Sequence, residues 1–202
     1  MGISAKDFEK IQARLNGRSA RVPAAVQTSG LSASAKHQII LGIDPSLRGT
    51  GFGVIRCGKP HATTLTHGTV SCPAGWARSR CLLQLFNALR EAIAKHKPTV
   101  CAIEGLFYAQ NLQTALIMGE ARGAALVAAA EGGLEIFEIA PRKVKQAIVG
   151  YGAAQKTAVS KMVQRMLHLA EEPSPDAADA LALALAFAQE NSRFSLAAPK
   201  RV

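Results

Sequence analysis

Ile40-Leu-Gly-Ile-Asp-Pro-Ser-Leu-Arg-Gly-Thr-Gly-Phe-Gly-Val-Ile55 is the most informative stretch of this sequence. Its first part belongs to an apolar run, Gln38–Asp44, that ends in a carboxylate, as is typical of a buried strand. Residues Pro45–Thr50 have the composition of a turn, and Gly51–Cys57 is again apolar. The stretch therefore predicts a β-hairpin whose first strand ends in an acid.

The segments that follow the hairpin have either strand or helix patterns. We expect further strands at Ala62–Val70, Val100–Glu104 and Leu134–Glu138. Helical spacing predicts helices at Trp76–Lys97, Asn111–Glu131, Arg142–Ile148, Lys156–Leu169 and Pro175–Asn191. The last helix includes an apolar run, Ala180–Ala188, and must be buried because no face of that run is polar. This order predicts an α/β fold, with a five-stranded mixed sheet and helices on both faces.

Composition limits the class of protein. The chain of 202 residues suits one globular domain, and its longest apolar runs are far shorter than the roughly 20 residues that cross a bilayer. The N-terminal residues contain no apolar stretch, so no secretory signal is expected. The four cysteines form no Cys-x-x-Cys pair, which argues against a zinc site or a disulfide framework. We therefore expect a cytoplasmic, nucleoid-associated protein.

The balance of charge favours a polyanionic partner. Lys and Arg number 24 against 14 Asp and Glu, which gives a formal net charge of +10. Nucleic acid is the commonest partner of such a chain, although a basic surface can also serve solubility alone. The composition of residues 1–37 predicts a basic, loosely ordered arm that either touches the phosphate backbone or is only a tail. We expect one folded domain at residues 38–192 and a short basic tail at residues 193–202.

Four acidic residues stand out by their positions. Asp44 and Glu104 each end a predicted buried strand, where an acid either reaches solvent or needs a compensating partner such as a metal ion. Asp176 and Asp179 begin the last helix, with Ser174 as its expected N-cap, and they project from the same helical face. Asp176 could simply offset the helix dipole, whereas Asp179 leads directly into the apolar run and needs a partner.

These acids favour a hard cation. No matching set of His or Cys accompanies them, so Mg²⁺ is expected, with Mn²⁺ as its substitute, rather than zinc. Two such ions about 4 Å apart can assist phosphodiester cleavage by activating a water and stabilising the leaving oxygen. Acids of this kind on a basic chain are typical of a metal-dependent nuclease.

Five segments together resemble the RuvC family, the Holliday-junction resolvases with a ribonuclease H-like fold. They occur in family order between about residues 38 and 190: Ile40–Ile55, Ala102-Ile-Glu-Gly-Leu-Phe-Tyr-Ala-Gln-Asn111, Gly119-Glu-Ala-Arg-Gly123, Val144-Lys-Gln146 and Asp176-Ala-Ala-Asp-Ala-Leu-Ala182. The resemblance implies a structure-specific endodeoxyribonuclease that resolves four-way DNA junctions by cutting two strands symmetrically during recombination and repair. It also implies a Mg²⁺-dependent homodimer with two ions in each active site. Branch-migration helicase proteins are candidate partners.

The resemblance also assigns roles to particular residues. The four catalytic, metal-binding positions match Asp44, Glu104, Asp176 and Asp179. The DNA-binding positions are Phe107, Lys145, Lys156 and Arg122. Phe107 matches an aromatic that stacks on a base near the junction centre, and the two lysines match basic residues near the scissile phosphate. Taken alone, Phe107 could be a packing residue, and the lysines could be solvated helix charges.

Other functions remain open at this stage. One is another ribonuclease H-like nuclease acting on branched DNA or RNA-containing substrates, and another is a junction-binding module that does not cleave. Actin-like sugar kinases share the hairpin pattern but need two such lobes, which this chain is too short to supply. Small residues at Ala115, Gly119 and Gly123 permit close approach of another helix, which can be internal or belong to a second subunit.

Overall fold

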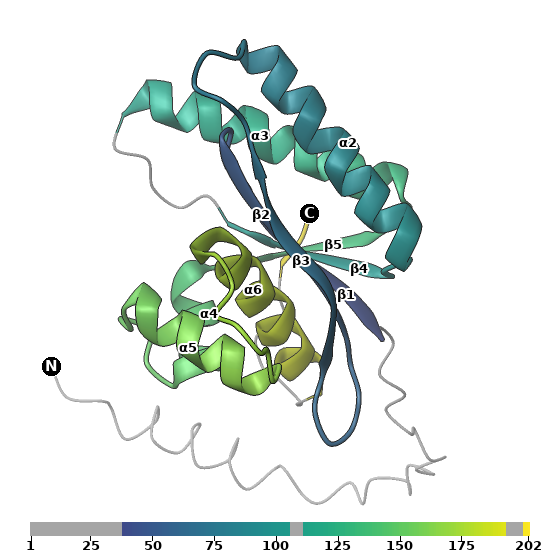
Figure 1. The fold of residues 1–202 in the computed structure, drawn as a ribbon, viewed down its shortest axis with the longest axis vertical. Helices are drawn as coiled ribbons and strands as arrows, with labels where there is room; N and C mark the ends of the chain where they lie inside the picture. The colour runs from purple at the N-terminus through teal and green to yellow at the C-terminus, as the bar shows by residue number, and fades with distance from the viewer. Residues whose placement is uncertain (1–37, 106–110, 193–199) are drawn as a thin grey trace, which may run out of the picture. The chain divides into compact units, whose positions relative to one another are not determined.

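A six-stranded mixed sheet forms the centre of the computed structural model, which describes residues 38–105, 111–192 and 200–202 (Figure 1). The strands lie in the order β3-β2-β1-β4-β5-β6. Their bounds are β1 (Ile39–Asp44), β2 (Gly49–Arg56), β3 (Thr63–Ser71), β4 (Val100–Glu104), β5 (Glu135–Ile139) and β6 (Lys200–Arg201). The first three strands pair antiparallel, whereas β1, β4 and β5 run parallel. The predicted hairpin and mixed sheet are thus confirmed.

Helices cover both faces of this sheet, as predicted. On one face lie α2 (Arg78–His96) and α3 (Leu112–Glu131), and on the other lie α4 (Pro141–Val149), α5 (Lys156–Met166) and α6 (Pro175–Ser192) (Figure 1). The order of these helices and of β1–β5 agrees with the order predicted from the sequence. Most of their ends differ from the predicted ends by one to three residues. None of the described helices has the length and hydropathy needed to cross a bilayer.

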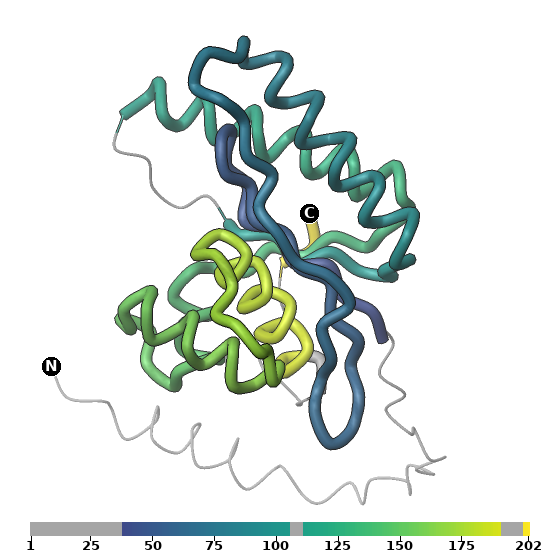
Figure 2. Tube along the Cα trace, in the orientation of Figure 1, coloured from purple at the N-terminus to yellow at the C-terminus, as the bar shows by residue number. Residues whose placement is uncertain are grey.

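The prediction of five strands is wrong by one strand. Lys200–Arg201, part of the predicted basic tail, pairs antiparallel with the outer edge of β5 (yellow segment in Figure 2). Two basic residues carry no alternating pattern, so only their pairing with β5 identifies them as a strand. Residues 1–37, with the predicted arm, lie outside the described part of the chain.

Two apolar cores follow from the alternation of side chains along the strands. Leu41 and Ile43 on β1 pack toward α2 and α3, whereas Ile40 packs toward α6. The apolar run of α6 is buried from Ala180 to Phe187, as its lack of a polar face requires, and Ala188 is partly buried. Asp44 has the same parity as Ile40 and therefore projects on the α6 face of the sheet.

Candidate active site

Asp44 and Glu104 come together because their strands are parallel neighbours. Ile43 on β1 is in register with Ile103 on β4, so the two acids that follow end adjacent strands on the same face. Their carboxyl groups share a hydrogen bond, and both residues are only partly exposed. The sequence predicted the end of each strand, and the pairing of the strands brings these ends together.

The environment of the two acids disfavours their charged forms. Burial raises the pKa of Asp44, and the nearby charges of Asp179 and Asp176 raise it further, whereas the hydrogen bond from Glu104 lowers it. Burial, together with the charge and hydrogen bond of Asp44, raises the pKa of Glu104 to about 8. The ammonium of Lys156 opposes these shifts at both acids. Such a concentration of negative charge favours binding of a cation.

Glycines in the hairpin allow α6 to lie directly on the sheet, with its acidic residues near the end of β1. A Cβ atom on Gly51 would lie 1.9 Å from the backbone oxygen of Asp176, and one on Gly42 would lie 1.9 Å from that of Ala180. A Cβ atom on Gly53 would meet the Leu181 side chain at 2.6 Å. Only glycine permits this approach of helix backbone to strand. The close packing places the first turn of α6, and with it the aspartates, beside the end of β1.

The N-terminal end of α6 is also tied to the sheet by Ser174. Its backbone oxygen accepts a hydrogen bond from the amide of Ala178 at 2.8 Å, as an N-cap residue does. Its hydroxyl lies 2.8 Å from the hydroxyl of Thr69 on β3. Ser174 therefore connects the start of the helix, which carries Asp176 and Asp179, to β3.

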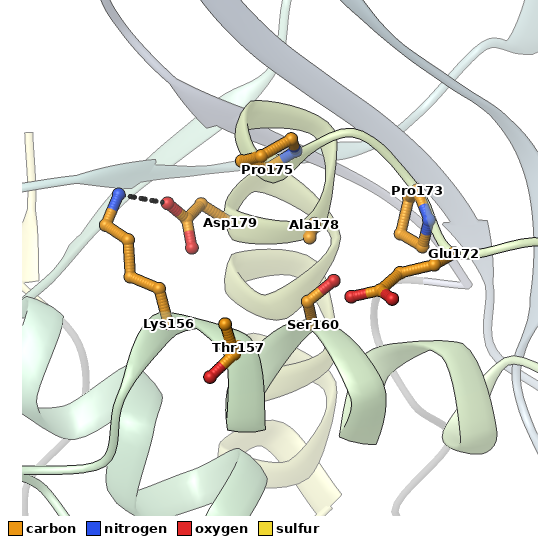
Figure 3. A pocket seen from close by; sticks show the side chains of 8 residues that line it. All are labelled: Lys156, Thr157, Ser160, Glu172, Pro173, Pro175, Ala178 and Asp179. Atoms are coloured by element: carbon orange, nitrogen blue, oxygen red, sulfur yellow. Dashed lines mark hydrogen bonds and ion pairs between the residues drawn. The ribbon is translucent and has the colours of Figure 1, made fainter.

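Lys156 adds a cation to the acidic group. Its Nζ donates to Oδ2 of Asp179 at 2.7 Å, from the start of α5 to the first turns of α6 (Figure 3). The hydrogen bond to Asp179 is the main cause of a raised pKa of Lys156, and the charges of Asp44 and Glu104 raise it further. The pair borders a cavity of about 340 Å³ that is also lined by Ser160 and Pro175 (Figure 3). A lysine ammonium at this edge can meet a phosphate that approaches the acids.

The other predicted DNA-binding residues have different surroundings. Lys145 is half-buried on α4, and the described residues show no ion pair that includes it. Phe107 lies outside the described residues, so its stacking role stays a prediction. Arg122 is mostly buried and forms an ion pair with Glu138 on β5, a partner that the sequence pattern did not identify. Contact of any of them with DNA also remains a prediction.

The chemistry of the donor set fits a hard divalent cation. Asp44, Glu104, Asp176 and Asp179 offer carboxylate oxygens only, the ligands that Mg²⁺ and Mn²⁺ prefer. Within the described residues, no three His, Cys, Asp or Glu side chains are arranged so that they could already coordinate a metal ion. Instead, Asp44 shares its hydrogen bond with Glu104, and Asp179 pairs with Lys156.

Comparison with known proteins agrees with this geometry. The model of the family "Crossover junction endodeoxyribonuclease RuvC" matches residues 40–187. A relative with that name in Akkermansia muciniphila is 47% identical over 146 residues, which are 72% of this chain and 87% of the relative. Another, in Halorhodospira halophila, is 46% identical over 153 residues, 76% of this chain and 91% of the relative.

Solved structures give the same result. Thermus thermophilus RuvC aligns with a TM-score of 0.71 at 32% identity, covering 81% of this chain and 99% of the other. The T. thermophilus RuvC structure in complex with a Holliday junction substrate has a TM-score of 0.70 at 34% identity, over 75% of this chain and 93% of the other. The yeast mitochondrial resolvase Ydc2, at 14% identity and a TM-score of 0.52, shares the fold.

Proposed function

Because this chain belongs to the RuvC family of crossover junction endodeoxyribonucleases, we propose that Asp44, Glu104, Asp176 and Asp179 are the metal-binding catalytic residues of a junction resolvase. The protein hydrolyses phosphodiester bonds in four-way DNA junctions, and enzymes of its family depend on divalent metal ions. The assignment rests on one observation: Asp44 and Glu104 lie next to each other and close to the first turns of α6, which carry Asp176 and Asp179.

We assign metal binding to the acidic residues of the site and contact with the phosphate backbone to its lysines. The carboxylates of Asp44, Glu104, Asp176 and Asp179 would hold Mg²⁺, and we propose two ions in each site. The bound ions would supply activation of a water and stabilisation of charge at the scissile phosphate. Lys156 holds Asp179 by its ion pair and offers an ammonium to the phosphate backbone, with Lys145 on α4 as a second basic contact.

Recognition of the junction needs more than phosphate contacts. Phosphate contacts position a protein on DNA but do not distinguish a junction from a duplex. At a strand-exchange point, an unstacked base can accept an aromatic ring at little cost, which is the role we propose for Phe107. In the sequence, Phe107 follows Glu104, the last residue of β4, by three positions.

We further propose that the protein acts as a homodimer through the outer face of α3. Exposed apolar side chains on that helix, Leu112, Leu116 and Val127, are spaced so as to share one face with Gly119 and Gly123. A contiguous exposed apolar face typically marks an interaction site, and a junction with two equivalent strands suits a two-fold dimer. We also propose that the protein acts in the cytoplasm at the nucleoid and that branch-migration helicase proteins are its partners.

A cleavage assay on defined substrates tests the function. The full-length chain is incubated with a synthetic four-way junction, a linear duplex and an RNA–DNA hybrid, with Mg²⁺ or with EDTA. We expect paired cuts in the junction only, and only with Mg²⁺. Asp44→Asn should bind the junction normally but cut it at least about 100-fold more slowly, because an amide is a poor ligand for the cation.

A matched control is Glu91→Gln, which neutralises an exposed acid on α2, across the sheet from the site. It should cut at the wild-type rate. Faster cutting of the hybrid than of the junction would identify a different ribonuclease H-like nuclease. Tight junction binding without any cutting would identify a non-cleaving module, and undiminished cutting by Asp44→Asn would remove this residue from the mechanism.

A further inference from the structure

Arg122 connects a helix to the ends of two parallel strands. It lies on α3, and its side chain is only 11% exposed. Nη2 forms an ion pair with Oε2 of Glu138 on β5, whose side chain is 19% exposed. Nη1 donates to the backbone oxygen of Glu104 at 3.4 Å. One guanidinium thus contacts the ends of both β4 and β5.

These contacts use the particular shape of arginine. The guanidinium is planar and presents several donors in a fixed fork, so it can serve a carboxylate and a carbonyl on neighbouring strands at once. A lysine ammonium in the same place could keep the ion pair with Glu138 but would not supply this fork. Because the side chain is mostly buried and engaged internally, it is poorly placed to neutralise a DNA phosphate.

The backbone of Glu104 is where this contact matters. Glu104 is the last residue of β4, and its strand is held on one side by β1 and on the other by β5. Beyond it, the amide of Gly105 donates to the backbone oxygen of Ile139 at 3.0 Å. The Arg122 bond adds a further restraint at the residue whose carboxyl group faces Asp44. The orientation of that carboxyl group depends on the backbone that carries it.

We propose that Arg122 is a positioning residue that fixes the Glu104 backbone, so that the Glu104 carboxylate is held ready to bind the metal ion. The inference rests on the proposed function, in which Glu104 is a metal ligand. Arg122 contacts neither the cation nor the DNA in this assignment. It acts through the carbonyl oxygen of Glu104 and is itself held by Glu138, which makes this pair a support for the metal site.

Metal affinity of the free protein is the decisive measurement. Binding of Mn²⁺ or Mg²⁺ alone is followed by calorimetry for the wild type, Arg122→Gln and Arg122→Lys. We expect the dissociation constant to rise about 10–100-fold in Arg122→Gln, the usual effect of losing a residue that orients a metal ligand. Arg122→Lys should retain most of the thermal stability while still losing metal affinity, because it keeps the charge but lacks the fork.

Two further variants complete the comparison. Glu138→Gln leaves the arginine in place and weakens its anchor, so its metal affinity should fall less than that of Arg122→Gln. The control is Arg78→Gln, which removes a more exposed ion pair, 3.0 Å long, between α2 and Glu120 on the same helix as Arg122. Its metal affinity should equal that of the wild type.

Junction binding in EDTA separates this role from DNA contact. A positioning residue leaves junction affinity and its salt dependence unchanged. If Arg122→Gln instead weakens junction binding and lowers the log–log salt slope by about 1, with metal affinity intact, Arg122 is a phosphate contact and the proposal is overturned. A lower melting temperature with unchanged metal affinity of the folded protein would overturn it as well, in favour of a purely structural ion pair.

Failure of the proposed function would look different. If Glu104→Gln binds Mn²⁺ as tightly as the wild type, Glu104 is not a metal ligand, and both proposals fall. If Glu104→Gln loses metal binding but Arg122→Gln does not, only the positioning role is refuted. Because these measurements use the metal alone, they do not depend on which DNA substrate the enzyme cuts.

Discussion

Ionisation of the partly buried Glu104 lowers the stability of the fold, although the same carboxylate belongs to the proposed metal site. Its burial beside Asp44 raises its pKa from 4.5 to about 8, so around neutral pH the folded chain holds a proton that the unfolded chain has released. A group with a raised folded pKa stabilises the fold fully below its unfolded pKa, and this contribution is lost as the pH rises through the folded value. In EDTA, the protein should therefore lose stability between about pH 4.5 and 8 on account of this residue.

Glu104→Gln should remove that loss. With EDTA present, we expect the variant to melt at a higher temperature than the wild type at about pH 9, with a smaller difference at about pH 5.5. A gain of about 1 kcal/mol corresponds to ~2–4 °C in a chain of this size. Added Mg²⁺ should raise the melting temperature of the wild type more than that of the variant. A difference between the two proteins that stays the same at both pH values would contradict the assigned environment of Glu104.

At the same scale, the sequence predicted the four acids but not the contacts of Arg122. Asp44 and Glu104 were recognisable because each ends an apolar run, and Asp179 because an apolar helix follows it. Arg122 was assigned to DNA binding from its motif, whereas its contacts are with Glu138 and the Glu104 backbone. No local pattern reports such contacts, because they join three elements that are distant in sequence.

At the scale of elements, periodicity was sufficient for the order of helices and strands. The apolar stretch of α6 required burial and is buried from Ala180 to Phe187, and the predicted mixed sheet is present. The sequence did not specify that β1 pairs with β4 in parallel. The contact of α6 with the hairpin could not be predicted in the same way. It depends on the absence of side chains at Gly42, Gly51 and Gly53, and glycine in a strand signals a close approach without saying what approaches.

Gly51→Ala tests this packing. The added methyl group would lie 1.9 Å from the backbone oxygen of Asp176 and 2.4 Å from its carbonyl carbon, so α6 must shift away from the sheet. We expect a loss of about 1–3 kcal/mol of stability, typical of overpacking, which denaturant unfolding would measure. The Mg²⁺ concentration for half-maximal cleavage should also rise, because the shift moves Asp176 away from Asp44.

The matched control is Gly75→Ala, at a site where a Cβ atom would meet nothing within 4 Å. It should preserve both the stability and the metal dependence. Wild-type stability together with wild-type cleavage in Gly51→Ala would show that α6 does not need this contact.

At the scale of the whole molecule, α3 has two sides with different roles. Its inner side packs against α2 and the sheet through buried alanines, and Arg122 reaches from it to β4 and β5. Its outer face exposes Leu112, Leu116 and Val127 at 76%, 58% and 59%. One helix therefore carries both the proposed dimer face and Arg122, the proposed support of the proposed metal site.

Gly119→Leu tests the dimer on this face. A Cβ atom on Gly119 would meet nothing within 4 Å among the described residues, so a side chain added there starts in open space. In a dimer packed through α3, the same side chain would force the two helices apart, because small residues are what permit their close approach. Sedimentation should show a wild-type dimer at micromolar concentration and a variant that dissociates at the same concentration, with an unchanged melting profile for the monomer. Gly75→Leu, also at an open position, should remain dimeric.

On a supercoiled plasmid bearing a cruciform, the wild type should produce mainly linear product by paired incision. Gly119→Leu should produce mainly nicked circles, since one active site can still cut one strand while the second cut loses its partner. A wild-type chain that is monomeric with and without junction DNA would refute the dimer, and a dimeric Gly119→Leu with normal paired incision would place the subunit contact elsewhere.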